Sequence, residues 1–160
     1  MVDGVDRVPA ARTFRATLEP RPRGGIVVTV PFDPAAAWRP RDHYYVAGTI
    51  GGMPMRGTVE VADDRATIAL GPTWCRDRAV AAGTTHDVVL APEGPQLETV
   101  PAELGERLRA DDEARRRFES LATFYRKGFV EPMERAVKPE TRVRRAEAIM
   151  AALQEGRREV

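Results

Sequence analysis

The stretch His43–Val61, "HYYVAGTIGGMPMRGTVEV", decides the fold prediction because two β-rich runs flank Gly51 and Gly52. Glycine readily adopts the positive φ angles that a two-residue hairpin turn requires. A turn at these glycines sets the register of the whole hairpin. On one face, the residues expected to stand opposite each other are Ile50 and Met53, Gly48 and Met55, Val46 and Gly57, and Tyr44 and Val59.

This register divides the hairpin side chains between two faces. Tyr44, Met53 and Met55 lie on the more apolar face, so we expect it to point into a core. Tyr45 and Arg56 lie on the other face and are expected to point outward, opposite Thr58 and Ala47.

Period-two alternation continues on both sides of the hairpin and predicts strands at residues 13–19, 25–31, 65–71 and 86–92. The turn-like segment "PRPRGG" between the first two predicts that they form a hairpin of their own. Short strands separated by Gly and Pro are typical of small barrels. We therefore predict a mainly β fold with α-helices, in which a small closed β-barrel of about six strands covers residues 12–100.

A period of 3.6 residues replaces the alternation near residue 101 and predicts a C-terminal helical segment of three to four helices at residues 101–160. Asp111 or Asp112 is expected to cap one helix, and the last helix is expected to begin at Pro139. Pro132 has no N–H to donate within a helix, so we expect a break near Glu131.

The segment "AVKPETRVRR", Ala136–Arg145, concentrates positive charge at the start of the last helix. At 100° per residue, Arg142 lies at the margin of the apolar face, whereas Arg144 points almost away from it. We therefore expect Arg142 to pair with a carboxylate such as Glu131 or Glu134. The alternative is an anion site at the helix N-terminus; the candidate residues for either site are Lys138, Arg142 and Arg145.

The barrel offers candidate residues for a ligand or docking surface, namely Trp38, Tyr44, Tyr45, Met53, Met55, Arg56 and Trp74. An enclosed small molecule would contact the apolar members of this set, although a barrel this small normally fills its interior with side chains. On the outer face, Tyr45 and Arg56 suit either single-stranded nucleic acid or docking of the helical segment, but Glu60 shares that face.

Residues for metal or nucleophilic chemistry are few. Cys75 is the single cysteine, His43 and His86 are the two histidines, and none has the spacing of a metal site. Ser120 is the single serine and falls in a helical pattern, which disfavours a serine triad. We expect no metal and no cofactor, and we interpret Cys75 as an inert buried residue and His43 as a surface residue.

The composition and the net charge limit the classes of partner that we expect the chain to bind. A net charge of +1 over 160 residues gives no field that would steer the chain onto nucleic acid or an anionic membrane. The start lacks the apolar stretch of a secretory signal, and a lone cysteine fits a reducing compartment. We expect a cytoplasmic monomer or homodimer that binds an unknown small molecule or protein, but neither nucleic acid nor a membrane.

The order of the motifs "VPF", "GGMPMRG", "LGPTWCRD", "VVLAPEGPQ", "LATFYRKGFV" and "KPETRVRR" resembles the YdeI/OmpD-associated, or bacteriocin-protection, family over residues 12–158. The resemblance implies a small β-barrel domain of unknown function and a helical tail. It also implies a non-enzymatic binding or stress-tolerance role, because some members are linked by name to bacteriocin or antimicrobial-peptide protection.

Two positions depart from the family pattern "WIxxAKxPETR": Pro132 replaces its tryptophan and Val137 replaces its lysine. A binding feature that depended on those two family residues would be lost or moved in this chain. The alternative function is a cofactor-free enzyme or small-molecule binder that uses the barrel interior. A cavity lined by Tyr44 and the methionines would favour that alternative, and a filled barrel would favour the interaction protein.

Overall fold

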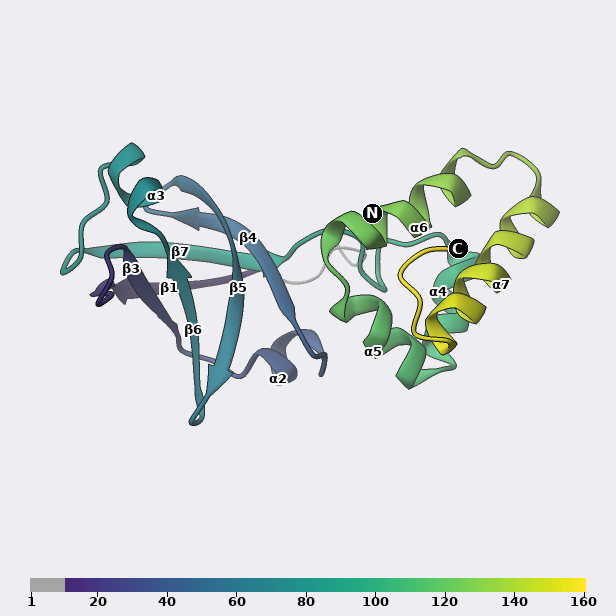
Figure 1. Ribbon diagram of the computed structural model, residues 1–160, viewed down its shortest axis with the longest axis horizontal. Helices are drawn as coiled ribbons and strands as arrows, with labels where there is room; N and C mark the ends of the chain where they lie inside the picture. The colour runs from purple at the N-terminus through teal and green to yellow at the C-terminus, as the bar shows by residue number, and fades with distance from the viewer. Residues whose placement is uncertain (1–10) are drawn as a thin grey trace, which may run out of the picture. The chain divides into compact units, whose positions relative to one another are not determined.

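The computed structural model describes residues 11–160, which fall into two compact units that meet in sequence at Pro92 and Glu93 (Figure 1). The expected lack of a secretory signal concerns the N-terminal residues, of which 1–10 lie outside the described part. Each unit has its own apolar core. Among the helices of residues 11–160, none combines the length and apolar character needed to cross a bilayer.

The first unit is an antiparallel β-barrel, which confirms the predicted fold class. Its strands are β1 (Arg12–Thr17), β2 (Glu19–Pro20), β3 (Ile26–Val30), β4 (Tyr44–Ile50), β5 (Met53–Ala62), β6 (Arg65–Leu70) and β7 (Thr85–Pro92). They form one 7-stranded sheet in the order β1-β7-β4-β5-β6-β3-β2.

The N-terminal stretch closes this sheet almost completely, because only Leu18 separates β1 from β2. Strand β1 pairs with β7, with Arg12 opposite Leu90, whereas β2 pairs with β3, with Glu19 opposite Val27. The expected hairpin between residues 13–19 and 25–31 is therefore wrong except at β2. Pairing the first strand with the last removes most of the open edge that a simple hairpin would have left.

The central hairpin has the predicted register, from Ile50 opposite Met53 to Tyr44 opposite Val59. Gly51 and Gly52 have φ angles of 56° and 81°, as the turn requires. Met55 is buried at 4% exposure, but Met53 is 42% exposed, so the predicted burial of Met53 is wrong.

The exposure of Met53 follows from its place at the tip of the hairpin, as the first residue of β5 beside the Gly51–Gly52 turn. Strand β5 pairs with β6 only between Val59 and Ala62, so its first residues extend beyond that neighbour. Met53 lies on the same face of β5 as Met55, the face that points into the barrel, but no residue of β6 is paired beside it. Parity alone therefore does not bury a side chain at the end of a barrel.

Two short helices belong to the barrel unit. Helix α2 (Pro34–Trp38) connects β3 to β4 and is capped by Asp33, whose carboxylate accepts from the Ala35 N–H at 3.0 Å. Helix α3 (Pro72–Asp77) lies between β6 and β7.

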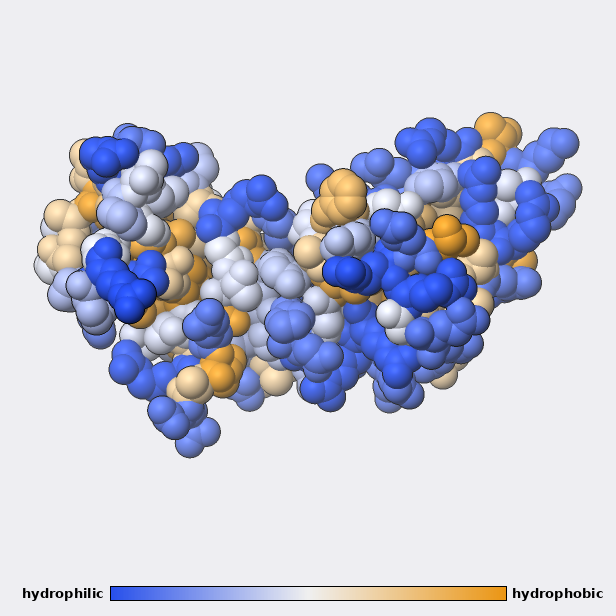
Figure 2. Space-filling model, viewed as in Figure 1, coloured by the Kyte–Doolittle hydropathy of each residue, from blue (hydrophilic) through white to orange (hydrophobic). Residues whose placement is uncertain are grey.

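The second unit contains four helices, α4 (Ala102–Arg109), α5 (Asp112–Ser120), α6 (Thr123–Arg135) and α7 (Pro139–Gln154). Asp111 caps α5 by accepting from the Ala114 N–H at 3.0 Å, and α7 begins at Pro139, as predicted. Figure 2 shows that the visible face of this unit is mainly hydrophilic, with small hydrophobic areas. Phe124 and Val137 are its strongly exposed large apolar side chains apart from the C-terminal residue, at 77% and 93%.

Helix α6 continues through Pro132, so the predicted break near Glu131 is wrong. Pro132 cannot donate to the carbonyl of Gly128, but Gly128 is exposed, and water can satisfy that carbonyl. Phe129 and Met133, on either side of the proline, are 3% and 0% exposed. Packing of these two side chains therefore outweighs the loss of one helical hydrogen bond.

Buried polar side chains fasten the segment that leads into α4. Arg126, 1% exposed, donates to the carbonyls of Leu121 at 2.9 Å and Pro95 at 2.6 Å. Glu119, fully buried, accepts from Arg115 at 2.8 Å and from the Leu97 N–H at 3.4 Å. Such satisfied networks give a loop a single defined position against its helices.

Candidate functional site

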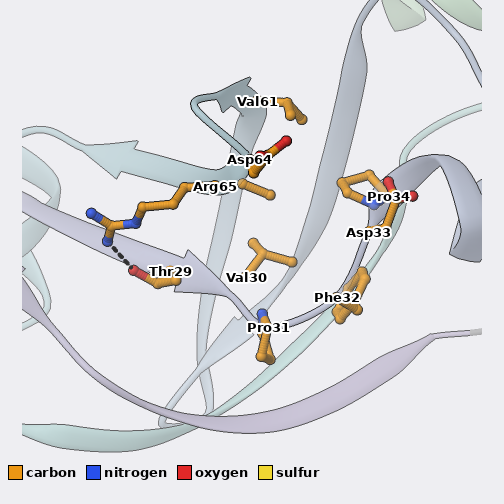
Figure 3. Close-up of a pocket in the computed structure, with 10 residues that line it drawn as sticks. Thr29, Val30, Pro31, Phe32, Asp33, Pro34, Val61, Asp64 and Arg65 are labelled. Carbon is orange, nitrogen blue, oxygen red and sulfur yellow. Dashed lines mark hydrogen bonds between the residues drawn. The ribbon is translucent and has the colours of Figure 1, made fainter.

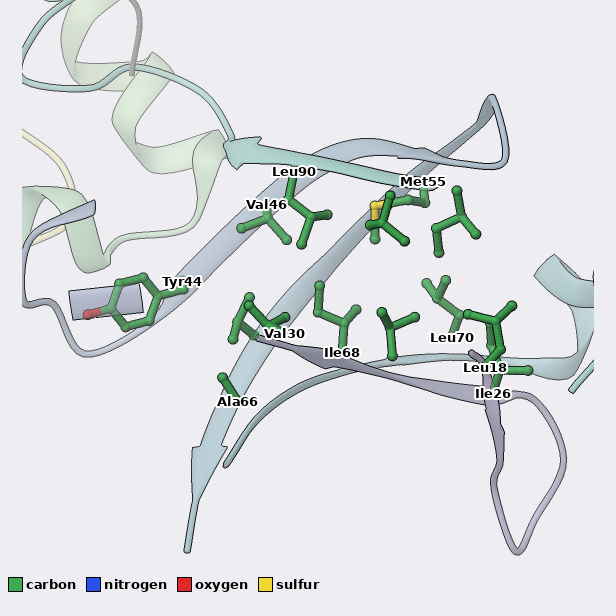
Figure 4. Packing of buried hydrophobic residues seen from close by; sticks show 14 of the residues in the cluster. Leu18, Ile26, Val30, Tyr44, Val46, Met55, Ala66, Ile68, Leu70 and Leu90 are labelled. Carbon is green, nitrogen blue, oxygen red and sulfur yellow. The ribbon is translucent and has the colours of Figure 1, made fainter. Parts of the chain in front are cut away.

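Side chains fill the barrel interior, where an enclosed ligand would have to bind. Trp38, Tyr44 and Met55 are 3%, 7% and 4% exposed and belong to one cluster with the apolar residues of the strands. In Figure 4 the labelled side chains point from the strands into the space between them. The Tyr44 hydroxyl donates to the carbonyl of Arg39 at 3.1 Å. These three candidate residues therefore form core.

Trp74 is held at the outside of the central hairpin. Its indole N–H donates to the carbonyl of Pro54 at 3.1 Å, and Arg78 Nε donates to the same oxygen at 3.2 Å. The Arg78 guanidinium also lies 5.4 Å from the centre of the indole ring. Trp74 is thus partly buried against the barrel and fixed by the hairpin backbone.

The outward residues of the hairpin lie where the register predicts. Tyr45 stands opposite Thr58 and is half-buried, whereas Arg56 stands opposite Ala47 and is exposed. His43 is exposed, with its ring centre 6.0 Å from that of Tyr45. A docking role for this face stays a prediction.

In the helical unit, Arg142 binds the carboxylate of Glu103 in a two-pronged pair. The Nε to Oε2 distance is 3.1 Å, the NH2 to Oε1 distance is 3.2 Å, and NH1 donates to the Met133 carbonyl at 3.2 Å. An ion pair at Arg142 was predicted, but its expected partners, Glu131 and Glu134, were wrong. Glu103 is half-buried in the first turn of α4, while both expected partners are exposed on α6.

The pair has a clear electrostatic effect on both groups. Hydrogen bonds from Arg142 lower the pKa of the Glu103 carboxyl below its ordinary value. The same hydrogen bonds, which Arg142 donates to the Glu103 carboxylate, raise the pKa of Arg142. Both groups are therefore held in their charged forms near neutral pH.

The other two cations of the predicted anion site face different surroundings. Arg145 donates to the carbonyl of Pro132 on α6, and Lys138 is the exposed residue at the N-terminus of α7. Arg142 forms its ion pair with Glu103. An anion site formed by these three residues stays a prediction, and it would have to compete with Glu103 for Arg142.

A groove of about 520 Å³ lies beside Arg142 in the helical unit. Its walls are formed by Leu97, Glu98, Thr99, Val100, Pro101, Ala102, Arg109, Glu134 and Arg142. Two arginines face two glutamates, so the lining charges balance. The groove therefore shows no preference for a cationic or an anionic ligand.

A second hollow, of about 540 Å³, opens at one end of the barrel and is called the barrel-end pocket below (Figure 3). Its lining consists of Thr29, Val30, Pro31, Phe32, Asp33, Pro34, Val61, Asp64, Arg65 and Ala66. The tight turn between β5 and β6 forms one side, with positive φ angles of 52° at Asp63 and 62° at Asp64. Aspartate tolerates this left-handed conformation better than most residues, so the turn chemistry places carboxylates at the rim.

The charges of this pocket do not cancel. Asp64 belongs to the β5–β6 turn and Asp33 to the start of α2, where one carboxylate oxygen caps the helix. Arg65 donates to the Thr29 hydroxyl at 3.0 Å and lies 3.9 Å from Glu19. In Figure 3 the Arg65 side chain extends toward Thr29, on the side away from Asp33. Asp33 and Asp64 thus place two carboxylates beside the apolar part of the lining, and Arg65 does not balance their charge.

Sequence reasoning missed the barrel-end pocket, because two segments that are far apart in the sequence, 29–34 and 61–66, form it. The available signals were the paired aspartates at 63–64 between two strands and the "FDP" segment at 32–34, where an aspartate precedes a proline. Each is also an ordinary turn or cap signal. The pairing of β3 with β6, with Val30 opposite Ala66, places both segments at one end of the barrel.

Within residues 11–160, no three His, Cys, Asp or Glu side chains gather as metal ligands do. Cys75 is partly buried and packs against the barrel core. Cys75 is thus less buried than expected, and its inertness stays a prediction.

Comparison with known families assigns both units. The sequence profile described as "Domain of unknown function (DUF1905)" matches residues 14–90, and the profile described as "Bacteriocin-protection, YdeI or OmpD-Associated" matches residues 99–156. No curated protein matches the chain significantly. The resemblance inferred from the motifs is confirmed: the helical segment matches the bacteriocin-protection, YdeI or OmpD-associated family, and the barrel that precedes it matches DUF1905.

Proposed function

We propose that this chain is a non-enzymatic cytoplasmic binding protein that contributes to tolerance of bacteriocins or cationic antimicrobial peptides. The barrel-end pocket is its proposed binding site. The observation that carries the proposal is the filled barrel interior, since Tyr44 and Met55 pack within the core and leave an open surface hollow as the place for a ligand. The family description supports the tolerance role.

The alternative, an enzyme or small-molecule binder that uses the barrel interior, finds little support. Ligand sites need a concave space with a few polar groups that fix the ligand. Val28, Ile68 and Val88 are fully buried in the middle of the barrel. A ligand there would have to displace core side chains.

The proposal is tested by thermal unfolding of the full chain with peptides and with small apolar molecules. A ligand that binds only the folded state raises the melting temperature, and the rise grows with its concentration. We expect a saturable rise with cationic peptides. The variant Val61→Lys should lose that response, because its ammonium group would occupy the pocket.

Val61 is 57% exposed, so its replacement should leave the fold intact. The matched control is Arg144→Ala, an exposed change in the helical unit that should keep the response. In bacteria that express the chain, the minimal inhibitory concentration of a cationic bacteriocin should rise with the wild type but not with Val61→Lys. Equal responses of wild type and Val61→Lys in both assays would refute the pocket as the binding site.

A further inference from the structure

The wall of the barrel-end pocket contains an apolar residue in an unusual position. Val61 has the inward parity of Val59, which is 4% exposed, yet Val61 itself is 57% exposed. It pairs with Ala66 near the end of the β5–β6 ribbon, where the inner surface of the sheet opens into the pocket. The pocket is therefore a continuation of the apolar barrel interior that the protein's own side chains do not cover.

Val30 and Phe32 extend this apolar surface across the pocket. Val30 is buried at 4% exposure, and the Phe32 ring packs edge-on against Trp38 with ring centres 5.1 Å apart. Phe32 also packs against Phe14 at 6.0 Å. These contacts fix the ring, so the lining is preformed and does not need to be ordered when a ligand binds.

We propose that the barrel-end pocket binds a lysine or arginine side chain of a peptide, with the aliphatic part on Val30, Phe32 and Val61 and the charged end between Asp33 and Asp64. This inference rests on the proposed function and names the chemistry of its ligand. A long basic side chain matches the pocket because it joins an apolar stem to a cationic head.

Charge complementarity favours a cationic ligand within the pocket lining, although the Arg12 guanidinium lies 5.7 Å from the centre of the Phe32 ring. The one arginine of the lining, Arg65, is turned to Thr29 and lies near Glu19, so it does not neutralise the two aspartates. An acidic peptide would be repelled by the same carboxylates. A purely apolar ligand would leave them without a partner at its edge.

The experiment uses the full chain and three synthetic peptides of equal length, with alternating Lys and Leu, Glu and Leu, or Lys and Ser. Titration calorimetry gives the dissociation constant of each at low and high salt. We expect the Lys–Leu peptide to bind most tightly and to weaken with salt, because exposed charge pairs are screened. The Glu–Leu and Lys–Ser peptides each lack one half of the required chemistry.

The decisive variant is Asp33→Asn with Asp64→Asn. Asparagine caps a helix as well as aspartate and tolerates the left-handed conformation, so both changes remove charge while preserving local structure. Two lost surface charge pairs should raise the dissociation constant of the Lys–Leu peptide roughly 3- to 10-fold and reduce its salt dependence. The matched control is Asp77→Asn in α3, outside the pocket, which should change neither.

The outcomes separate the two proposals. If the Glu–Leu peptide binds as well as the Lys–Leu peptide, or if the double variant binds as tightly as the wild type, the cation inference is wrong while a binding function stands. If neither leucine-containing peptide binds the wild type, both proposals fail. A loss of affinity confined to the double variant, with an unchanged melting temperature, supports the inference.

Discussion

Arg142 holds both carboxylate oxygens of Glu103 and the backbone carbonyl of Met133, so one side chain of α7 connects to both α4 and α6. Its neighbour Arg144 is exposed on the same helix. The two arginines therefore differ in contacts although they share charge, helix and sequence surroundings.

Arg142→Ala should lower the melting temperature of the full chain measurably more than Arg144→Ala. The first change leaves the half-buried Glu103 carboxylate without its partner, whereas the second removes a solvated side chain. Thermal unfolding followed by circular dichroism measures both. Equal losses would mean that the pair contributes nothing beyond an ordinary surface charge.

The same pair predicts a pH dependence. The folded-state pKa of Glu103 lies below its ordinary value of 4.5, so its stabilising effect is complete above that value and is lost as the pH falls through the folded pKa. The difference in free energy of unfolding between wild type and Glu103→Gln should therefore be largest near neutral pH and shrink in acid. Denaturant titrations across this range measure the difference. Glu106→Gln, an exposed change in the same helix, is the control, and a gap that widens in acid would contradict the assignment.

Met55→Ala should reduce the free energy of unfolding of the barrel by about 2 to 5 kcal/mol, because it leaves a cavity in a filled core. Met53→Ala, only two residues away, should cost about 0.5 kcal/mol or less, since its side chain is largely in solvent. Urea denaturation of the two variants provides the comparison. A similar cost at both positions would show that the end of the hairpin is packed more tightly than its exposure indicates.

Pro132→Ala should stabilise the helical unit by about 1 to 3 kcal/mol, because alanine restores the N–H for the Gly128 carbonyl and has the higher helix propensity. The bond from Arg145 uses the backbone carbonyl of residue 132 and should persist. The midpoint of chemical denaturation should shift upward with an unchanged slope. A destabilised variant would indicate that packing of the proline ring outweighs the missing hydrogen bond.

Some parts of the fold could be predicted from the sequence. The register from Tyr44 to Val59 follows from two glycines, because a short turn leaves one alignment for the strands it joins. The cap at Asp111 and the start of α7 at Pro139 also follow from residues that are neighbours in the sequence. Each depends on interactions between residues close in sequence, which is why the sequence pattern was sufficient.

The predictions that were wrong concern features that depend on residues far apart in the sequence. Strand β1 pairs with β7 and not with its sequence neighbour, and Arg142 pairs with Glu103 on a helix whose position no local pattern specifies. At Pro132, the local rule was outweighed by burial of Phe129 and Met133. The barrel-end pocket could not be predicted for the same reason, since Asp33 and Asp64 line one pocket only because β3 pairs with the distant strand β6.

The pairing of β1 with β7 also determines when the barrel can fold during synthesis. Arg12 lies opposite Leu90, so β1 cannot pair with β7 until residues 85–92 have been synthesised. The central hairpin can form earlier, because its two strands are made in succession. Closure of the barrel therefore has to wait for β7, and until then the edges of β1 and β4 that β7 later pairs with are open to pairing with another chain.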